Sequence, residues 1–173
     1  MASVVFLRGV NVGGRKTFKP AELCRALNEW DVVNIGAAGT FVVRASIAAA
    51  ALKAEILRRL PFDPEVMICP GREIVRLVGD NPFEKLKAGD DAKPFVTVLA
   101  KRPRTSRDLP VRQPDNDDWQ VHVVAVTGRY ALSLHRRQTG TLIYPNEVVE
   151  KHFHTPATTR SWNTMEAVCK LLT

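Results

Sequence analysis

The order of short apolar segments in the first 70 residues restricts the possible folds more than any other feature of this sequence. Runs that are rich in Val, Ile and Phe predict strands, and apolar residues that recur every three or four positions predict helices. The matching segments are, in chain order, a strand over 3–8, a helix over 20–30, the strands VVNIG and TFVVRA, a helix over 47–60 and the strand EVMIC. This order predicts a ferredoxin-like unit, in which helices cover one side of an antiparallel sheet.

Capping signals mark the two helices of this segment. Pro20 stands where the first turn of a helix tolerates proline. Ser46 is the expected N-cap of the second helix, because its hydroxyl can accept a hydrogen bond from a backbone N–H of the first turn. Pro61 is expected to end that helix.

The second half of the chain is less regular. After a short helix over 72–79, the patterns predict a strand KPFVTVLAK, a hairpin WQVHVVAVTGRYALSLHRR and the helices NEVVEKHF and WNTMEAVCKLL. The segment RPRTSRDLPVRQPDNDD, rich in proline and charge, is expected to be a surface loop. We therefore predict an α+β fold of two ferredoxin-like subdomains, residues 1–80 and 81–173, packed against each other.

The charge of the chain is consistent with an anionic partner. Its 173 residues include 25 basic and 18 acidic side chains, which gives a net charge of +7. Such a balance attracts nucleic acid, nucleotides and other anions alike. Because the basic residues are spread over both halves of the chain, the composition indicates no terminal segment or half that is specialised for nucleic-acid binding.

We expect a cytoplasmic protein without a membrane partner, metal or cofactor. The longest nearly apolar run is interrupted by Lys53 and Glu55, well short of the roughly 20 residues that a membrane-spanning helix needs. Cys24, Cys69 and Cys169 form no C-x-x-C pair, which favours buried thiols in a reducing compartment.

Two distant motifs resemble those of the bacterial domain of unknown function 1697 family. FLRGVNVGG is similar to the opening LLRGINVGG of that family, and PATTRSWNTMEAV is similar to its closing ATTRNWNTV. The resemblance covers nearly the whole chain and implies two ferredoxin-like subdomains, but no established activity. The residues that match the motifs are Arg8, Gly9, Asn11, Gly13, Gly14, Thr158, Thr159, Arg160, Trp162, Asn163 and Thr164.

The chain departs from the family pattern in one loop. Where the family has a polar Y-I-Q-S-G-N ahead of its third strand, Ala37, Ala38 and Thr40 replace Gln, Ser and Asn. Ser161 also replaces an Asn in the closing motif. If these polar groups contact a ligand in relatives, this chain has fewer donors and acceptors for it.

The loop that follows the first strand is the first candidate for an anion site. Glycines between a strand and a helix allow backbone N–H groups to converge on an anion. The spacing matches neither G-x-G-x-x-G nor G-x-x-x-x-G-K-[ST], so a dinucleotide or Walker-type site is not predicted. A purely structural turn is the alternative. The expected anion-binding residues of this loop are Arg8, Asn11, Gly13, Gly14, Arg15 and Lys16.

The closing motif is the second candidate. Thr159, Ser161 or Asn163 could cap the last helix, and Asn163 with Glu166 has the spacing of a capping box. Capping does not account for Arg160, a bidentate donor at the expected helix start that suits a phosphate or an internal carboxylate. The expected anion-binding residues of this segment are Thr159, Arg160 and Asn163. Our hypothesis is that Arg8 and Arg160 converge on one anionic ligand.

A basic loop gives a third, weaker candidate. Lys101, Arg102, Arg104 and Arg107 could contact a phosphate backbone, although such loops are more often simply solvated. Near the end of a predicted helix, His152 and His154 are two residues apart and do not share a helical face, so we predict no metal pair there.

The sequence has little that points to catalysis. It contains neither G-x-S-x-G nor H-E-x-x-H. The function predicted is non-catalytic binding of a phosphate-bearing ligand, either nucleic acid or a phosphorylated small molecule such as a nucleotide. One alternative is a hydrolase of the acylphosphatase kind, with phosphate held by the loop after the first strand. The other is a protein-interaction module, for which a large exposed apolar patch would be evidence.

Overall fold

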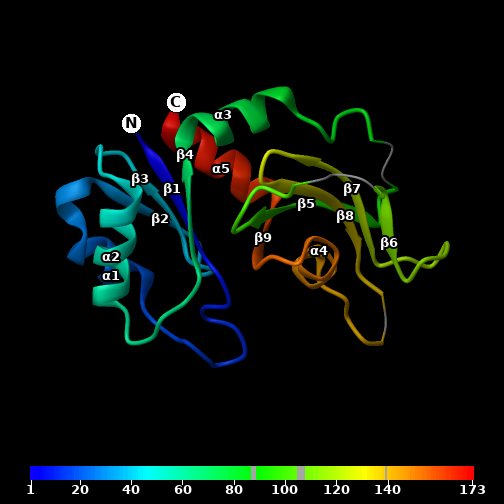
Figure 1. Cartoon of the computed structure of the whole chain (residues 1–173), viewed down its shortest axis with the longest axis horizontal. Coiled ribbons are helices and arrows are strands. Elements are labelled where there is room, and N and C mark those ends of the chain that lie inside the picture. The colour runs from blue at the N-terminus through cyan, green and yellow to red at the C-terminus, as the bar shows by residue number, and fades with distance from the viewer. Residues whose placement is uncertain (87–88, 105–107, 139) are drawn as a thin grey trace. The chain divides into compact units, whose positions relative to one another are not determined.

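The computed structural model spans residues 1–173 and describes all of them except 87–88, 105–107 and 139. The described residues form two antiparallel sheets and five α-helices, which confirms the predicted α+β class (Figure 1). They group into two compact units. The first unit comprises residues 1–81 and 164–173, and the second comprises residues 82–163.

The first unit contains the predicted order of strand, helix, strand, strand, helix, strand. Its sheet has the order β2-β3-β1-β4, and each neighbouring pair is antiparallel. The elements are β1 (Ser3–Leu7), α1 (Pro20–Ala26), the 3-10 helix η1 (Asn28–Trp30), β2 (Val32–Ile35), β3 (Thr40–Val43), α2 (Ala49–Arg59), β4 (Val66–Pro70) and α3 (Gly71–Asp80).

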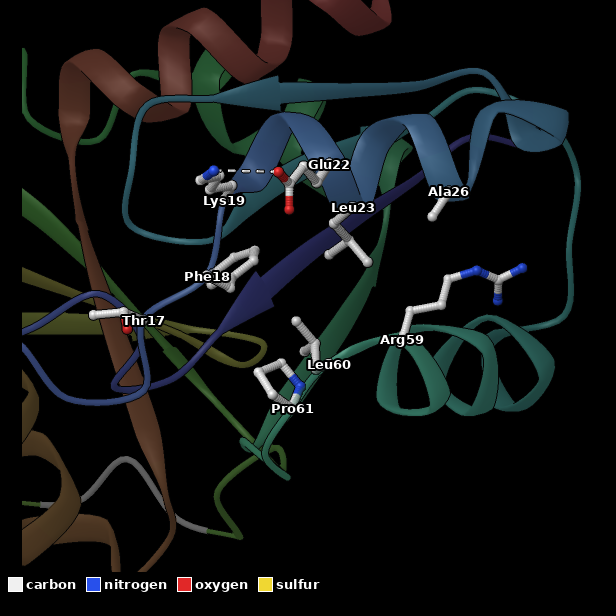
Figure 2. A pocket seen from close by; sticks show the side chains of 9 residues that line it. All are labelled: Thr17, Phe18, Lys19, Glu22, Leu23, Ala26, Arg59, Leu60 and Pro61. Carbon is white, nitrogen blue, oxygen red and sulfur yellow. Dashed lines mark ion pairs between the residues drawn. The ribbon is translucent and has the colours of Figure 1, made fainter.

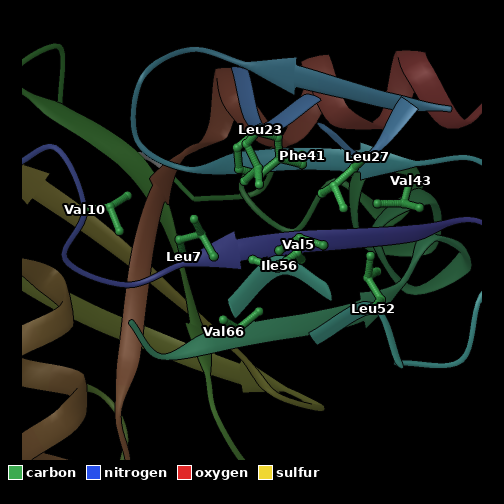
Figure 3. Packing of buried hydrophobic residues seen from close by; sticks show 10 residues of the cluster. All are labelled: Val5, Leu7, Val10, Leu23, Leu27, Phe41, Val43, Leu52, Ile56 and Val66. Atoms are coloured by element: carbon green, nitrogen blue, oxygen red, sulfur yellow. The ribbon is translucent and has the colours of Figure 1, made fainter. Parts of the chain in front are cut away.

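A hydrophobic cluster joins this sheet to α1 and α2 (Figure 3). Because side chains alternate along a strand, Val5 and Leu7 share the face of β1 that the two helices cover. Burying one such side chain stabilises the fold by about 1.5–3 kcal/mol. The buried members of the cluster are Val5, Leu7, Val10, Leu23, Leu27, Phe41, Val43, Leu52, Ile56 and Val66.

The opposite face of this sheet is also covered. Figure 1 shows α3 and the C-terminal part of α5 (Trp162–Leu172) on the side away from α1 and α2. A Cβ on Gly71 would lie 2.8 Å from Leu172 Cδ2, and Arg44 Nε donates to the carbonyl of Leu171 at 3.4 Å. The last ten residues therefore pack into the first unit, and its sheet has helices on both faces rather than on one.

The second unit has five antiparallel strands in the order β6-β7-β8-β5-β9. One face packs against α4 through Val148 and Val149, which join a cluster with Leu99, Val121 and Ala131. The elements are β5 (Ala92–Leu99), β6 (Val111–Gln113), β7 (Val121–Thr127), β8 (Tyr130–Arg136), α4 (Pro145–Phe153) and β9 (Ala157–Ser161).

The structure corrects two local predictions in these units. The expected surface loop contains β6, which pairs with β7 through Val111 and Gln113. The helix over 47–60 begins at Ala49 after Ala48, so Ser46 is not its N-cap. For β6, three residue pairs with β7 form despite the loop-like composition, because strand pairing satisfies backbone N–H and C=O groups regardless of the flanking prolines.

The first part of the closing motif forms a strand, and the second part forms the last helix. Residues Ala157–Ser161 form β9, which pairs with β5 along its whole length. Because α5 begins at Trp162, Thr159 lies in the strand and Asn163 lies inside the first helical turn. Of the three expected capping residues, only Ser161 stands directly before the first residue of α5, whereas Thr159 and Asn163 do not. Arg160 is a strand residue.

Candidate functional site

The loop after β1 folds as a miniature hairpin. Arg15 N–H donates to the carbonyl of Val12 at 3.0 Å, and Asn11 N–H donates to the carbonyl of Lys16 at 3.1 Å. Gly13 and Gly14 form the tip, with φ of 58° and 72°. Positive φ at both central residues is what a two-residue type I′ turn requires. The turn alone therefore explains why both positions are glycine.

Asn11 holds this hairpin to the turn between β2 and β3. Its Nδ2 donates to the carbonyl of Ala37 at 2.9 Å, and its Oδ1 accepts from Phe18 N–H at 2.9 Å. Gly39 completes the contact, since a Cβ there would lie 2.7 Å from Val10 Cγ2. The acceptor at residue 37 is a backbone carbonyl, so the replacement of the family's Gln by Ala leaves this bond available.

The cations of the hairpin differ in exposure. Arg15 and Lys16 are exposed, as are Gly13 and Gly14. Arg8 is half-buried, and its backbone N–H donates to the backbone carbonyl of Glu65 at 3.0 Å. The hairpin thus presents two exposed cations to solvent, while its shape is set by bonds within the first unit.

Arg160 lies in the interior of the second unit. Only 6% of its surface is exposed, and Nη1 donates to Thr158 Oγ1 at 2.8 Å and to the carbonyl of Thr159 at 2.9 Å. Burial lowers the pKa of Arg160 to about 10, because the charged guanidinium loses hydration. Arg8 and Arg160 belong to different units, and their convergence on one ligand stays a prediction.

A groove in the second unit is lined by three of the four cations predicted for the basic loop, Lys101, Arg102 and Arg104. Its volume is about 410 Å³. We call it the basic groove, and its lining residues are Lys101, Arg102, Pro103, Arg104, His152, Phe153, His154, Thr155 and Pro156. None of these described residues carries a carboxylate, so the side chains named here can contribute positive but not negative charge.

Strand pairing brings the two sides of the basic groove together. One side follows β5, and the other connects α4 to β9. Leu99 pairs with Ala157 in the ladder, and Ala100 N–H donates to the carbonyl of Pro156 at 2.8 Å just beyond it. Arg129 Nε also donates to the carbonyl of Leu99 at 2.8 Å, which fixes the end of β5. His154, with φ of 52°, ends α4 in a left-handed conformation.

The charges of the basic groove are open to a ligand. Lys101, Arg102 and Arg104 are exposed, and within the described residues no ion pair joins any of them to a carboxylate. The His152 ring meets the Phe153 ring edge to face, with centroids 4.7 Å apart. The groove therefore combines three side chains that are positively charged at neutral pH, two imidazoles and one phenyl ring.

The sequence predicts part of this set. Lys101, Arg102 and Arg104 were expected as weak nucleic-acid contacts, whereas Arg107 lies outside the described residues. His152 and His154 were considered only as a metal pair. Across the described parts of the chain, no three His, Cys, Asp or Glu side chains gather as metal ligands would. The missing signal was the β5–β9 pairing, which joins segments about 60 residues apart.

A second groove lies in the first unit, between the start of α1 and the end of α2 (Figure 2). Its volume is about 640 Å³, and Phe18, Leu23, Leu60 and Pro61 give it an apolar lining. Its charged side chains already have partners. Lys19 pairs with Glu22 at 3.4 Å, and Arg59 pairs with Glu55 and Glu29. This groove is less suited to an anion than the basic groove.

A family model described as "Protein of unknown function (DUF1697)" matches residues 1–128. The chain belongs to this family. The match includes the opening motif of DUF1697 and ends before the PATTRSWNTMEAV segment. The resemblance expected from the sequence is thereby confirmed, and the family description assigns no activity.

Structural comparison supports the fold of this DUF1697 chain. It is similar to a conserved bacterial protein from Streptococcus pneumoniae at 14% sequence identity, with a TM-score of 0.64. The alignment covers 99% of this chain and 98% of that protein. At this identity the likeness shows the fold alone. No curated protein matches the chain. Among the helices of the described residues, none has the length and apolarity to cross a membrane.

Proposed function

We propose that this DUF1697 protein binds a phosphate-bearing ligand without catalysing a reaction, with nucleic acid ahead of free nucleotides. One observation carries the proposal: three exposed cations and two histidines line the basic groove, with no carboxylate among them. An anion placed there is attracted by the three cations that follow β5, faces imidazole hydrogen-bonding groups on the other side, and meets repulsion from none of the described lining side chains.

Nucleic acid is favoured because the cations are exposed and lie along an open groove. A phosphate backbone presents one charge after another, and each contact with Lys or Arg releases counterions, so several modest contacts add up. The net charge of +7 supports the encounter by long-range attraction. The Phe153 ring beside His152 offers a surface on which a base can stack.

The hairpin of residues 8–16 is proposed as a secondary contact. Arg15 and Lys16 are exposed and can reach a phosphate. Asn11 contributes less, since both ends of its amide are already used within the first unit. Arg160 donates to two groups of its own strand and is almost wholly buried, which favours a role in positioning β9.

Hydrolysis is not part of the proposal. In the acylphosphatase-like alternative, an amide side chain near the phosphate loop would position the attacking water. The four residues of β3 are Thr40, Phe41, Val42 and Val43, which are all buried and include no amide. The interaction-module alternative is not adopted either, since Met1, Val12 and Tyr144, the exposed large hydrophobics of the described residues, come from separate segments.

The finer fold and location follow as proposals from the same reasoning. The order β2-β3-β1-β4 with antiparallel pairs supports a ferredoxin-like first unit, with a subdomain division near residue 80. The second unit has four strands, then α4, then β9, so we do not extend that assignment to it. A cytoplasmic location stays a prediction from the sequence.

Fluorescence anisotropy with labelled single-stranded RNA and double-stranded DNA, at low and at physiological salt, tests the proposed function. We expect saturable binding that weakens steeply with salt, and a loss of at least about tenfold in affinity for Arg102→Ala/Arg104→Ala. The matched control is Lys53→Ala/Arg76→Ala, which removes the same charge from exposed positions of the first unit.

The control separates a site from a general charge effect. Equal weakening in both double variants would mean that net charge alone drives binding. Absence of binding at physiological salt would contradict the proposal and redirect the search to small phosphorylated metabolites.

A further inference from the structure

A second pocket of the second unit lies where the α4-covered face of its sheet ends. Lys93 of β5 pairs with His135 of β8, and alternate residues of each strand share a face, so Phe95 lies beside them. Leu99 and Ala131, farther along the same face, pack against α4. We call this space of about 340 Å³ the ring pocket, and it is lined by Asp91, Lys93, Phe95, His135, Arg137, Leu142 and Tyr144.

Three ring side chains line the ring pocket. Phe95 and His135 meet edge to face, with centroids 5.6 Å apart and an interplanar angle of 83°. Tyr144, the residue before α4, leaves 48% of its surface exposed. An exposed aromatic beside two others has a face that a planar ligand can cover, and burying that face is favourable.

The His135 ring is held in one orientation. Its Nε2 lies 3.0 Å from the carbonyl of Ile143, which can only accept, so Nε2 donates. Burial, with the nearby Arg137 charge as a smaller cause, lowers the pKa of His135, and the hydrogen bond to Ile143 only partly opposes this shift. At neutral pH the imidazole is therefore uncharged, and Nδ1 is left as an acceptor.

Charged groups of both signs complete the lining. Asp91 is exposed and can accept hydrogen bonds from an amino group, although it also lies 4.0 Å from Arg136. Lys93 and Arg137 are exposed cations. An apolar, ring-rich pocket with a few polar groups at its rim has the composition of a small-molecule site, and its volume is near the lower end of the roughly 300–1,000 Å³ of such sites.

We propose that the ring pocket binds a planar heteroaromatic ring of the nucleobase class, which stacks against Tyr144 and donates an exocyclic amino group to Asp91. The ring explains the aromatic lining, and the donor explains a carboxylate at an otherwise basic rim. This site is separate from the basic groove and needs no phosphate, so it goes beyond the proposed function.

The test is a titration of the isotope-labelled full chain with adenosine, followed by NMR, with ribose as the ringless control ligand. Adenosine is expected to shift the resonances of Phe95, His135 and Tyr144 saturably, and ribose is expected to leave them unchanged. Tyr144→Ala should weaken binding at least about fivefold, since stacking on one aromatic side chain contributes that much or more. Tyr144→Phe keeps the ring and should stay within about twofold.

Two results would overturn the proposal: no saturable shift at these residues, or equal affinity in Tyr144→Ala and the parent protein. Because the Tyr144 side chain is exposed, the Ala variant is expected to fold, and its dispersed spectrum verifies this. Adenosine carries no phosphate, so failure here leaves the basic groove untouched, and failure of RNA binding at the basic groove leaves this titration unaffected.

Discussion

The hairpin of residues 8–16 and the basic groove are both rich in cations, but the residues that characterise them have different roles in the fold. In the hairpin, the residues of the family motif are needed for shape: Gly13 and Gly14 form the turn, and Asn11 holds it to residues 18 and 37. In the basic groove, Lys101, Arg102 and Arg104 are exposed, and they form no ion pair with a carboxylate among the described residues. A motif that is recognisable in sequence can thus report a structural need, while a stronger candidate site carries no motif.

The largest effect should come from Gly39→Ala. A methyl group there would lie 2.7 Å from Val10 Cγ2 and 2.8 Å from Leu7 Cβ, at a φ of 76° that L residues rarely adopt. Overpacking and backbone strain together should lower the free energy of unfolding by about 3 kcal/mol. Gly14→Ala is the matched control, since it meets no atom within 4 Å and has only the strain of its φ of 72°. It should cost about 1 kcal/mol.

Urea unfolding of these two variants tests whether packing of the 36–39 turn against Val10 and Leu7 contributes to the free energy of unfolding. If Gly39→Ala and Gly14→Ala are equally stable, then the close contact of the 36–39 turn with Val10 does not contribute to stability, and the structural reading of the motif fails.

A smaller loss is expected for Asn11→Ala. Removing the amide leaves Phe18 N–H and the carbonyl of Ala37 without these partners, at a cost of about 1–2 kcal/mol in the free energy of unfolding. Ala37→Gln restores the family residue while keeping the backbone carbonyl, and should change stability by less than about 0.5 kcal/mol. Thermal unfolding of both variants measures the difference. A destabilising Ala37→Gln would show that the replacement is structurally required.

The smallest effect is a pH dependence confined to the second unit. Burial is the main cause that lowers the pKa values of His122 and His135 below the ordinary 6.5, and neighbouring arginine charges add to it. As pH falls through about 6.5, the unfolded chain binds protons that the folded unit does not, so stability decreases. The loss should grow between pH 7 and pH 5.

His135→Gln should reduce this pH dependence, because Gln keeps a donor for the carbonyl of Ile143 but does not titrate in that range. Urea midpoints at pH 7 and pH 5 provide the measurement. A His135→Gln protein that loses as much stability as the parent would rule out His135 as a source.

Local patterns predicted much of the fold. The last helix was predicted at residues 162–172 and is found there as α5, because its apolar residues recur at helical spacing. The strand predicted over 3–8 is present as β1 (Ser3–Leu7). β9 was not predicted, because its Thr-Thr-Arg core looks polar, and only burial in the folded unit reveals that Thr158 and Arg160 point inward.

The candidate site was predicted only in part, for a physical reason. The cations after β5 were visible as a charged segment, but His152 and His154 become their neighbours through the pairing of Leu99 with Ala157. Such a contact depends on the register between distant strands, and local periodicity contains no information about it. The ring pocket likewise arises from the pairing of Lys93 with His135.

The most direct test compares Arg102→Ala/Arg104→Ala with Arg15→Ala/Lys16→Ala in RNA binding at physiological salt. Each pair removes two exposed cations, one from the basic groove and one from the hairpin. We predict a loss of at least about tenfold for the groove variant and less than about threefold for the hairpin variant. The reverse order would contradict the account and assign the ligand to the loop that carries the family motif.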